Sequence, residues 1–141
     1  NADNEYARIY YQYNLRSIVE DNMIIYGEIY GSGIQKLKYG YKDGKIAFAV
    51  FDIKKDDMYL NWTDVEEFCK RHKLPVVPVL YRGKFSDEIV KSHIHGKSVL
   101  ADHVKEGIVV KPLIERSERS ERIIRKYVNE EFLMKDYGDL H

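Results

Sequence analysis

Two charged residues flank an apolar stretch late in the chain, in residues 106–112 (EGIVVKP). The alternation predicts a strand with a carboxylate, Glu106, at one end and an ammonium group, Lys111, at the other. Charges that are half-buried need partners, and a metal-bound phosphate would supply a partner for each. Glu106 would then hold the divalent metal, directly or through water, and Lys111 would meet the anion.

A second basic group follows in residues 125–132 (RKYVNEEF). Lys126 lies in a predicted strand close to the first one, so it could reach the same phosphate as Lys111. Two lysines aimed at one place would neutralise the charge that develops as pyrophosphate or AMP leaves.

A carboxylate surrounded by glycines marks residues 26–35 (YGEIYGSGIQ). Glycines let the backbone and Glu28 approach a bound ligand closely. A glycine-rich turn with a surface glutamate is the alternative interpretation, and an isolated glycine pattern does not decide between them.

An apolar strand with one carboxylate is predicted over residues 47–53 (AFAVFDI). Strict alternation places Phe48, Val50 and Asp52 on one face and Phe51 on the other. The small Ala47 and the equally small alanine at position 49 leave room for a flat ring to stack on the aromatic side chain. Taken alone, the segment is better explained as a core strand with two packed phenylalanines.

Along the chain, the clusters at residues 26–35, 47–53, 106–112 and 125–132 follow an order that resembles motifs III, IIIa, IV and V of the covalent nucleotidyltransferases. That superfamily contains DNA ligases, RNA ligases and mRNA capping enzymes. The glycine-rich cluster with its trailing Ile34 and Gln35 is similar to the RNA ligase branch, as are residues 96–100 (GKSVL). The resemblance covers nearly the whole chain, from about Tyr26 to Phe132.

The resemblance implies a role for each matching residue. Glu28 would contact the ribose of the bound nucleotide, and Phe48 would stack on the adenine. Glu106 would help to hold the divalent metal. Lys111 would lie on the phosphate side of the pocket, and Lys126 would contact the α-phosphate.

Two departures from the family pattern stand out. Motif V usually offers a second lysine two positions after the first, where this chain has Val128. The nucleophile motif, Lys-x-(Asp/Asn/His)-Gly, precedes motif III in the family, yet no lysine precedes Tyr26 here. The sequence at residues 42–44 (KDG) lacks the intervening residue, follows motif III and predicts a hairpin turn. We therefore expect residues 1–141 to be the C-terminal part of an RNA ligase adenylylation domain that lacks the N-terminal nucleophile segment.

The helices and strands that must position these residues alternate irregularly, which predicts an α+β fold with mostly antiparallel sheet. The resemblance implies that this fold is a partial ligase-type (ATP-grasp-like) nucleotidyltransferase domain. Helices are expected over residues 5–19, 63–71 and 86–92, the first capped by Asp3 and the second by Thr63. Strands are expected over residues 23–26, 34–39, 46–53, 75–81, 106–112 and 123–128. The Glu-Arg-Ser repeat of residues 115–122 predicts a solvated connection.

Composition bounds the class of protein. The 141 residues are one domain's worth, 44% hydrophobic and 33% charged, with a formal net charge of zero. A net charge of zero argues against a protein that binds nucleic acid through an overall positive charge, although it is compatible with a local basic groove. No apolar run is long enough to span a bilayer, and the single Cys69 fits a reducing cytoplasm. The histidines at 93, 95 and 103 predict surface residues rather than a metal site.

The parent protein is thus expected to be an ATP-dependent RNA ligase that uses Mg²⁺ or Mn²⁺. It would adenylylate itself, pass AMP to a 5′-phosphate on a nicked or single-stranded RNA end, and seal that end to a 3′-hydroxyl. These residues alone would not complete the first step. A non-catalytic nucleotide- or RNA-binding module and a domain of the DNA ligase branch are the alternatives.

Overall fold

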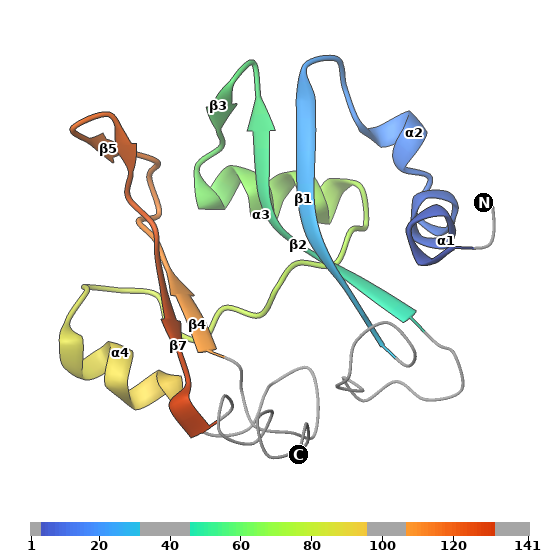
Figure 1. Cartoon of the computed structure of the whole chain (residues 1–141). Coiled ribbons are helices and arrows are strands. Elements are labelled where there is room, and N and C mark those ends of the chain that lie inside the picture. Colours follow the sequence, from blue (N-terminus) through green and yellow to red (C-terminus); the bar gives the residue numbers. More distant parts are fainter. Residues whose placement is uncertain (1–3, 32–45, 96–106, 132–141) are drawn as a thin grey trace.

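The computed structural model describes residues 4–31, 46–95 and 107–131, which form helices and antiparallel sheets as the α+β prediction requires (Figure 1). The helices are α1 Glu5–Gln12, α2 Leu15–Ile18, α3 Trp62–Arg71 and α4 Asp87–Ile94. The strands are β1 Met23–Gly31, β2 Ile46–Lys55, β3 Met58–Tyr59, β4 Gly107–Val110, β5 Ser117–Glu118, β6 Glu121–Arg122 and β7 Arg125–Val128. No described helix is long and apolar enough to cross a membrane.

A β-bulge interrupts the three-stranded sheet β1-β2-β3. The antiparallel register pairs Tyr26 with Asp52 and then Gly27 with Val50, so Phe51 is left without a partner on β1. The extra residue shifts the alternation of β2 by one position. The prediction that Val50 and Asp52 share a face is therefore wrong, because Val50 lies in the core and Asp52 faces the other side with Tyr26.

One face of this sheet packs against helices α1 and α3. The core contains Phe48, Val50 and Ile53 from β2, with Val65 and Phe68 from α3. Ile9 brings α1 into the same cluster. Helix α3 is amphipathic, and full burial of each large apolar side chain contributes about 1.5–3 kcal/mol. This burial fixes β2, and therefore fixes the residues on its opposite face.

Polar side chains decide where the helices begin and break. The first predicted helix starts after Asn4, whose Oδ1 accepts a hydrogen bond from the Ala7 N–H at 2.7 Å. It does not run to residue 19, because Asn14 adopts a left-handed conformation (φ 51°) between α1 and α2. The predicted cap Thr63 lies inside α3, which Asn61 precedes. For α4, Ser86 accepts from the Ile89 N–H at 3.2 Å, as expected for a cap.

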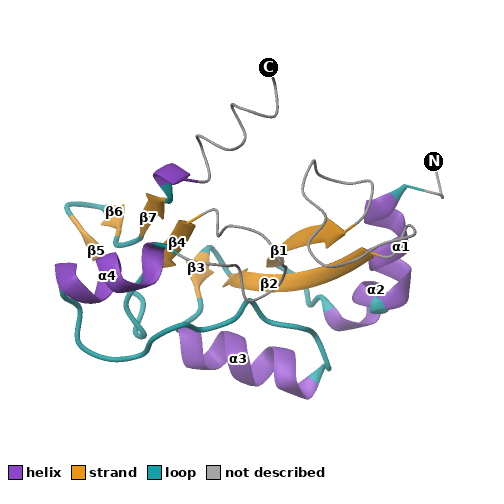
Figure 2. Cartoon of the chain, turned by 90° about the horizontal axis from the view of Figure 1, so that it is seen from below, coloured by secondary structure: helices purple, strands orange, loops and turns teal. Residues whose placement is uncertain are grey.

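The second part of the fold is an arm built on two short strand pairs. Strand β4 pairs antiparallel with β7, Val109 lying opposite Lys126, and β5 and β6 form a hairpin between them. In both views the β4–β7 pair and α4 lie at the opposite end of the molecule from α1 and α2 (Figure 2). The strand expected over residues 75–81 is reduced to a single parallel bridge between Val76 and Val50. The predicted strand over 34–39, the turn at 42–45 and Glu106 lie outside the described residues.

Candidate functional site

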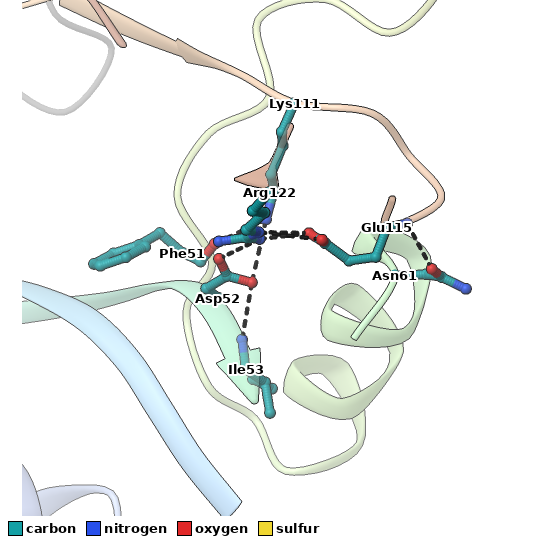
Figure 3. A network of polar contacts seen from close by, with 7 residues as sticks. All are labelled: Phe51, Asp52, Ile53, Asn61, Lys111, Glu115 and Arg122. Atoms are coloured by element: carbon teal, nitrogen blue, oxygen red, sulfur yellow. Dashed lines mark hydrogen bonds and ion pairs between the residues drawn. The ribbon is translucent and has the colours of Figure 1, made fainter. Parts of the chain in front are cut away.

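Asp52 lies at the junction between the three-stranded sheet and the arm, immediately after the bulge. Its side chain is only 3% exposed, and its two oxygens face cations from the arm (Figure 3). Oδ2 accepts from the Arg122 guanidinium at 2.6 Å, and Oδ1 lies 3.4 Å from the Lys111 Nζ. A buried carboxylate costs several kcal/mol unless it is paired, so these two contacts account for its presence inside an apolar strand.

Arg122 comes from β6, in the Glu-Arg-Ser repeat. Its Nε donates to both carboxylate oxygens of Glu115, at 3.0 and 3.1 Å, and its guanidinium lies 3.7 Å from the centre of the Tyr59 ring. The Nη2 group also donates to Glu115 Oε1, so two guanidinium nitrogens grip one carboxylate in the fork that arginine offers and lysine does not. The prediction that residues 115–122 are merely a solvated connection is wrong at both ends, because Glu115 and Arg122 are largely buried.

Lys111 follows β4 and is largely enclosed, with 13% of its side chain exposed. Besides Asp52, its Nζ approaches the Phe51 carbonyl oxygen at 3.3 Å and lies 4.5 Å from the centre of the Trp62 ring. Burial lowers the pKa of Lys111 below its ordinary value, and the nearby Asp52 carboxylate offsets part of that effect. Both of its hydrogen bonds to described residues are long, so neither the Asp52 carboxylate nor the Phe51 carbonyl oxygen holds the ammonium group tightly.

Backbone contacts dock the loop that carries Glu115 onto the start of α3. The Asn61 side chain accepts from the Glu115 N–H at 2.8 Å (Figure 3). The Trp62 N–H donates to the Leu113 carbonyl oxygen at 2.9 Å. Asn61 is therefore shared between the beginning of a helix and the attachment of the arm. The Ile123 N–H donates to the Arg116 carbonyl oxygen at 3.1 Å, which closes the hairpin that holds Arg122.

Glu28 and Phe48 lie on opposite faces of the sheet. Glu28 pairs with Ala49 and is exposed, on the same side as Tyr26 and Asp52. Phe48 pairs with Ile29, is 6% exposed and lies in the core. Its ring lies 5.8 Å from that of a tyrosine next to α1. The stacking role expected for Phe48 stays a prediction, and its surroundings in the structure are those of a packed core residue.

Phe51 is the more open aromatic residue of this strand. It is 38% exposed, and its ring centre lies 6.1 Å from that of Tyr26, which in turn lies 6.0 Å from Tyr59. The bulge turns Phe51 away from the core, and its own carbonyl oxygen is a contact of Lys111. Sequence alternation assigned Phe51 to the face away from Phe48 but did not single it out. The sequence feature that could have drawn attention to Phe51 is the carboxylate of Asp52, which directly follows it in an otherwise apolar strand.

Lys126 lies on an open face of the arm. Gly107, Val109 and Val128 share that face of the β4–β7 pair, and the two valines are 57% and 43% exposed. A side chain at Gly107 would clash with the Tyr127 carbonyl oxygen, 2.2 Å from the position of a Cβ. The structure brings Lys111 to Asp52, while Lys126 stays exposed on β7.

The metal and cysteine predictions concern other places. Among the residues described, no group of three His, Cys, Asp or Glu side chains could hold a metal ion, and Glu106 is outside them. Cys69 is fully buried in the core, which raises its pKa to about 11 and suits a packing role.

A family model and a solved structure resemble this chain. The RNA ligase family model matches residues 1–128. Among solved structures, a Naegleria gruberi RNA ligase with PPi superposes with a TM-score of 0.68 at 23% identity. The match covers 94% of this chain and 40% of that one, so this chain spans less than half of its structural neighbour. A search of curated proteins finds no significant relative. The chain belongs to the RNA ligase family.

Proposed function

We propose that this chain is the C-terminal part of the adenylylation domain of an ATP-dependent RNA ligase, with motifs III, IIIa, IV and V in residues 26–132. The single observation that carries the proposal is the placement of Lys111 beside Asp52 and Phe51, in a chain whose family is RNA ligase. An enclosed cation next to an open aromatic residue fits a phosphate that follows a stacked base.

The nucleotide would lie on the face of the sheet that carries Glu28. On that side Glu28 would contact the ribose, Lys111 would meet the phosphates, and Lys126 would contact the α-phosphate from the open face of the arm. Glu106 would hold Mg²⁺ or Mn²⁺, which would stabilise negative charge on the phosphate oxygens. Glu28 and Lys126 are both exposed, which supports access by a ligand.

Two aromatic residues are candidates for stacking on the adenine. The sequence pattern favours Phe48, whereas exposure favours Phe51, which is 38% exposed against 6% for Phe48. Phe51→Leu and Phe48→Leu are matched changes on one strand. We expect Phe51→Leu to weaken nucleotide binding at unchanged stability, and Phe48→Leu to lower the free energy of unfolding. Fluorescence titration with AMP and urea unfolding of both variants separate these outcomes, and the reverse pattern would restore Phe48 as the stacking residue.

The nucleophilic lysine of the parent protein would lie outside these 141 residues. In the parent, the lysine amine would attack the α-phosphorus of ATP, forming a P–N bond as pyrophosphate leaves. AMP would then pass to an RNA 5′-phosphate and leave when a 3′-hydroxyl attacks. Lys111 and Lys126 would neutralise charge on the transferring phosphate in each step.

Intact-mass spectrometry tests this assignment directly. The chain is incubated with ATP and Mg²⁺ beside a Lys42→Ala control. We expect no added AMP on either protein, while the longer gene product gains one AMP per molecule. An adduct on the 141-residue chain that disappears in the control would make Lys42 the nucleophile and overturn the proposal.

A non-catalytic nucleotide- or RNA-binding module is the second candidate, because an enclosed Lys111 beside Phe51 could bind a phosphorylated ligand without any covalent step. A longer gene product that binds ATP tightly but forms no covalent adduct would support it. For a gene product that does form the adduct, sealing assays on nicked RNA and nicked DNA then decide which polymer is joined.

A further inference from the structure

We propose that Arg122 is a positioning residue, which keeps Asp52 paired so that Lys111 is free to exchange Asp52 for a phosphate of the bound nucleotide. The inference rests on the proposed function, because it concerns how the phosphate side of the same pocket is prepared. It assigns a task to a residue in the β5–β6 hairpin, outside the four family motifs.

The two cations do not hold Asp52 equally. Arg122 contacts Oδ2 at 2.6 Å, whereas Lys111 lies 3.4 Å from Oδ1, an oxygen that also accepts the Ile53 N–H at 3.2 Å. Charge-assisted hydrogen bonds are short, about 2.7–2.9 Å, when they are strong. Asp52 therefore keeps its stronger partner and a backbone donor if Lys111 moves away.

Arg122 itself is fixed in place. The fork to Glu115 occupies its Nε, and the Tyr59 ring covers its guanidinium at 3.7 Å. Glu115 is anchored in turn through its N–H to Asn61. An arginine with two carboxylate partners and a ring against it cannot follow a ligand, so it is a stationary counter-ion.

Lys111 has the opposite character. Its two hydrogen bonds, to Asp52 at 3.4 Å and to the Phe51 carbonyl oxygen at 3.3 Å, are both long, and its third described contact is the face of the Trp62 ring, 4.5 Å from the ring centre. The ends of lysine side chains are flexible, and a phosphate is a stronger acceptor than a carbonyl oxygen at this distance. The four charged groups, two carboxylates and two cations, balance before a ligand binds. When Lys111 turns to a phosphate, Arg122 remains to compensate Asp52.

Removal of Arg122 would reverse this arrangement. Asp52 would become a buried carboxylate with Lys111 as its one remaining cation among the contacts described, and breaking such a pair is strongly unfavourable. Lys111 would then stay on Asp52, and the affinity for phosphorylated ligands would fall. Adenosine, which has no phosphate, would be unaffected.

The test compares AMP and adenosine binding by isothermal titration calorimetry for four proteins: wild type, Arg122→Gln, Arg122→Lys and the double variant Asp52→Asn/Arg122→Gln. We expect Arg122→Gln to weaken AMP binding about tenfold, which corresponds to roughly 1.4 kcal/mol, with adenosine binding unchanged. Arg122→Lys keeps the charge and should recover part of the affinity. The double variant no longer holds Lys111 on a carboxylate, so it should bind AMP more tightly than Arg122→Gln alone.

Each outcome decides between roles. Equal losses for AMP and adenosine, or a double variant weaker than the single one, would show that Arg122 only supports the fold and would overturn the inference. Unchanged AMP binding in Arg122→Gln would also overturn it while leaving the proposed function intact. A wild-type chain that binds neither ligand would remove the proposed pocket, and the inference with it.

Discussion

The three-stranded sheet and the arm are stabilised in different ways. Val50, Ile53 and Val65 in and under the sheet are 0% exposed, whereas Val109 and Ile114 in the arm are 57% and 71% exposed. The sheet has an apolar core of its own with α1 and α3. The arm is attached through Asp52, Arg122, Lys111 and the backbone contacts of residues 113–115.

This difference bears on the rigidity of the proposed motifs. The segments proposed as motifs III and IIIa lie on β1 and β2, which are held by apolar burial that is insensitive to charge and pH. The segment proposed as motif IV lies on the arm, and Lys111 contacts the sheet through the ionic cluster. The relation between the two halves of the proposed pocket therefore depends on a few charged groups more than on packing.

The largest expected effect comes from breaking the ionic cluster. Asp52→Asn leaves Arg122 and Lys111 facing a neutral amide, and removal of one partner from a buried ion pair costs about 3–5 kcal/mol. Urea unfolding followed by circular dichroism measures the loss. Glu20→Gln, which breaks the exposed Lys55–Glu20 pair at 2.9 Å, is the matched control and should leave stability unchanged. Equal losses in both variants would contradict the comparison.

Truncation of one core side chain should come next. Ile53→Ala removes a fully buried side chain and should cost about 2–5 kcal/mol, because it leaves a cavity between the sheet and α3. Ile114→Ala is the same chemical change in the arm at a residue 71% exposed, so it should cost less than about 0.5 kcal/mol. Thermal unfolding of the pair checks the contrast, and a costly Ile114→Ala would show that the arm has an apolar core after all.

A smaller effect is expected where β1 meets the core. A Cβ at Gly27 would lie 2.1 Å from the Phe48 ring, so Gly27→Ala forces a packed ring to shift and should cost about 1–3 kcal/mol. At Gly83 a Cβ would meet the hydroxyl of Tyr81 at 2.7 Å, the end of a side chain that is 44% exposed and donates a hydrogen bond to the Lys84 carbonyl oxygen at 3.1 Å. Gly83→Ala should therefore cost no more than that one exposed hydrogen bond, and less than Gly27→Ala. Denaturant midpoints that do not differ would mean that Phe48 can rotate away.

The smallest effect is a dependence on pH that belongs to Lys111. Burial lowers its pKa below the ordinary 10.5, so the unfolded chain binds more protons just below that pH. Between the folded-state pKa and 10.5, the contribution of Lys111 to the free energy of unfolding should therefore rise as the pH rises. Lys111→Met removes this slope. Parallel urea titrations over the alkaline range measure the difference, and identical slopes would place Lys111 in water.

Much of the sheet could be predicted from the sequence. The long apolar strand at β2 and the helices α3 and α4 follow from local pattern and were predicted within a few residues of their observed bounds. The bulge could not be predicted, because strict alternation in residues 47–53 fits either register. It decides which face Asp52 occupies, and so the assignment of Asp52 to the face of Phe48 was wrong.

The candidate site was harder to predict because its contacts are distant in sequence. Lys111 was selected for its place beside an apolar strand, but its contact with Asp52 spans 59 residues and has no local signature. Arg122 and Glu115 lay in a repeat whose composition is typical of solvated segments. A lone carboxylate in the middle of an apolar strand was the one clue that cations must come from elsewhere.

Two tight turns have the same left-handed design. Asp56 and Asp57 link β2 to β3 with φ of 50° and 65°, and Arg119 and Ser120 link β5 to β6 with φ of 51° and 67°. Positive φ at both central residues is the geometry of the two-residue hairpin that matches strand twist. Neither turn contains glycine. Aspartate tolerates the left-handed region, whereas arginine and serine do not favour it, so the turn at Arg119 and Ser120 depends on closure of β5 and β6.

These turns imply an order of folding. Hairpins of this size close in about 1–10 μs, whereas the cluster around Asp52 must wait until chain segments 59 residues apart meet. The β5–β6 hairpin can therefore form first and carry Arg122 to Asp52 already prepared. Docking of the arm would be a late event on the folding pathway, so mutations in the cluster should accelerate unfolding and leave the refolding rate nearly unchanged.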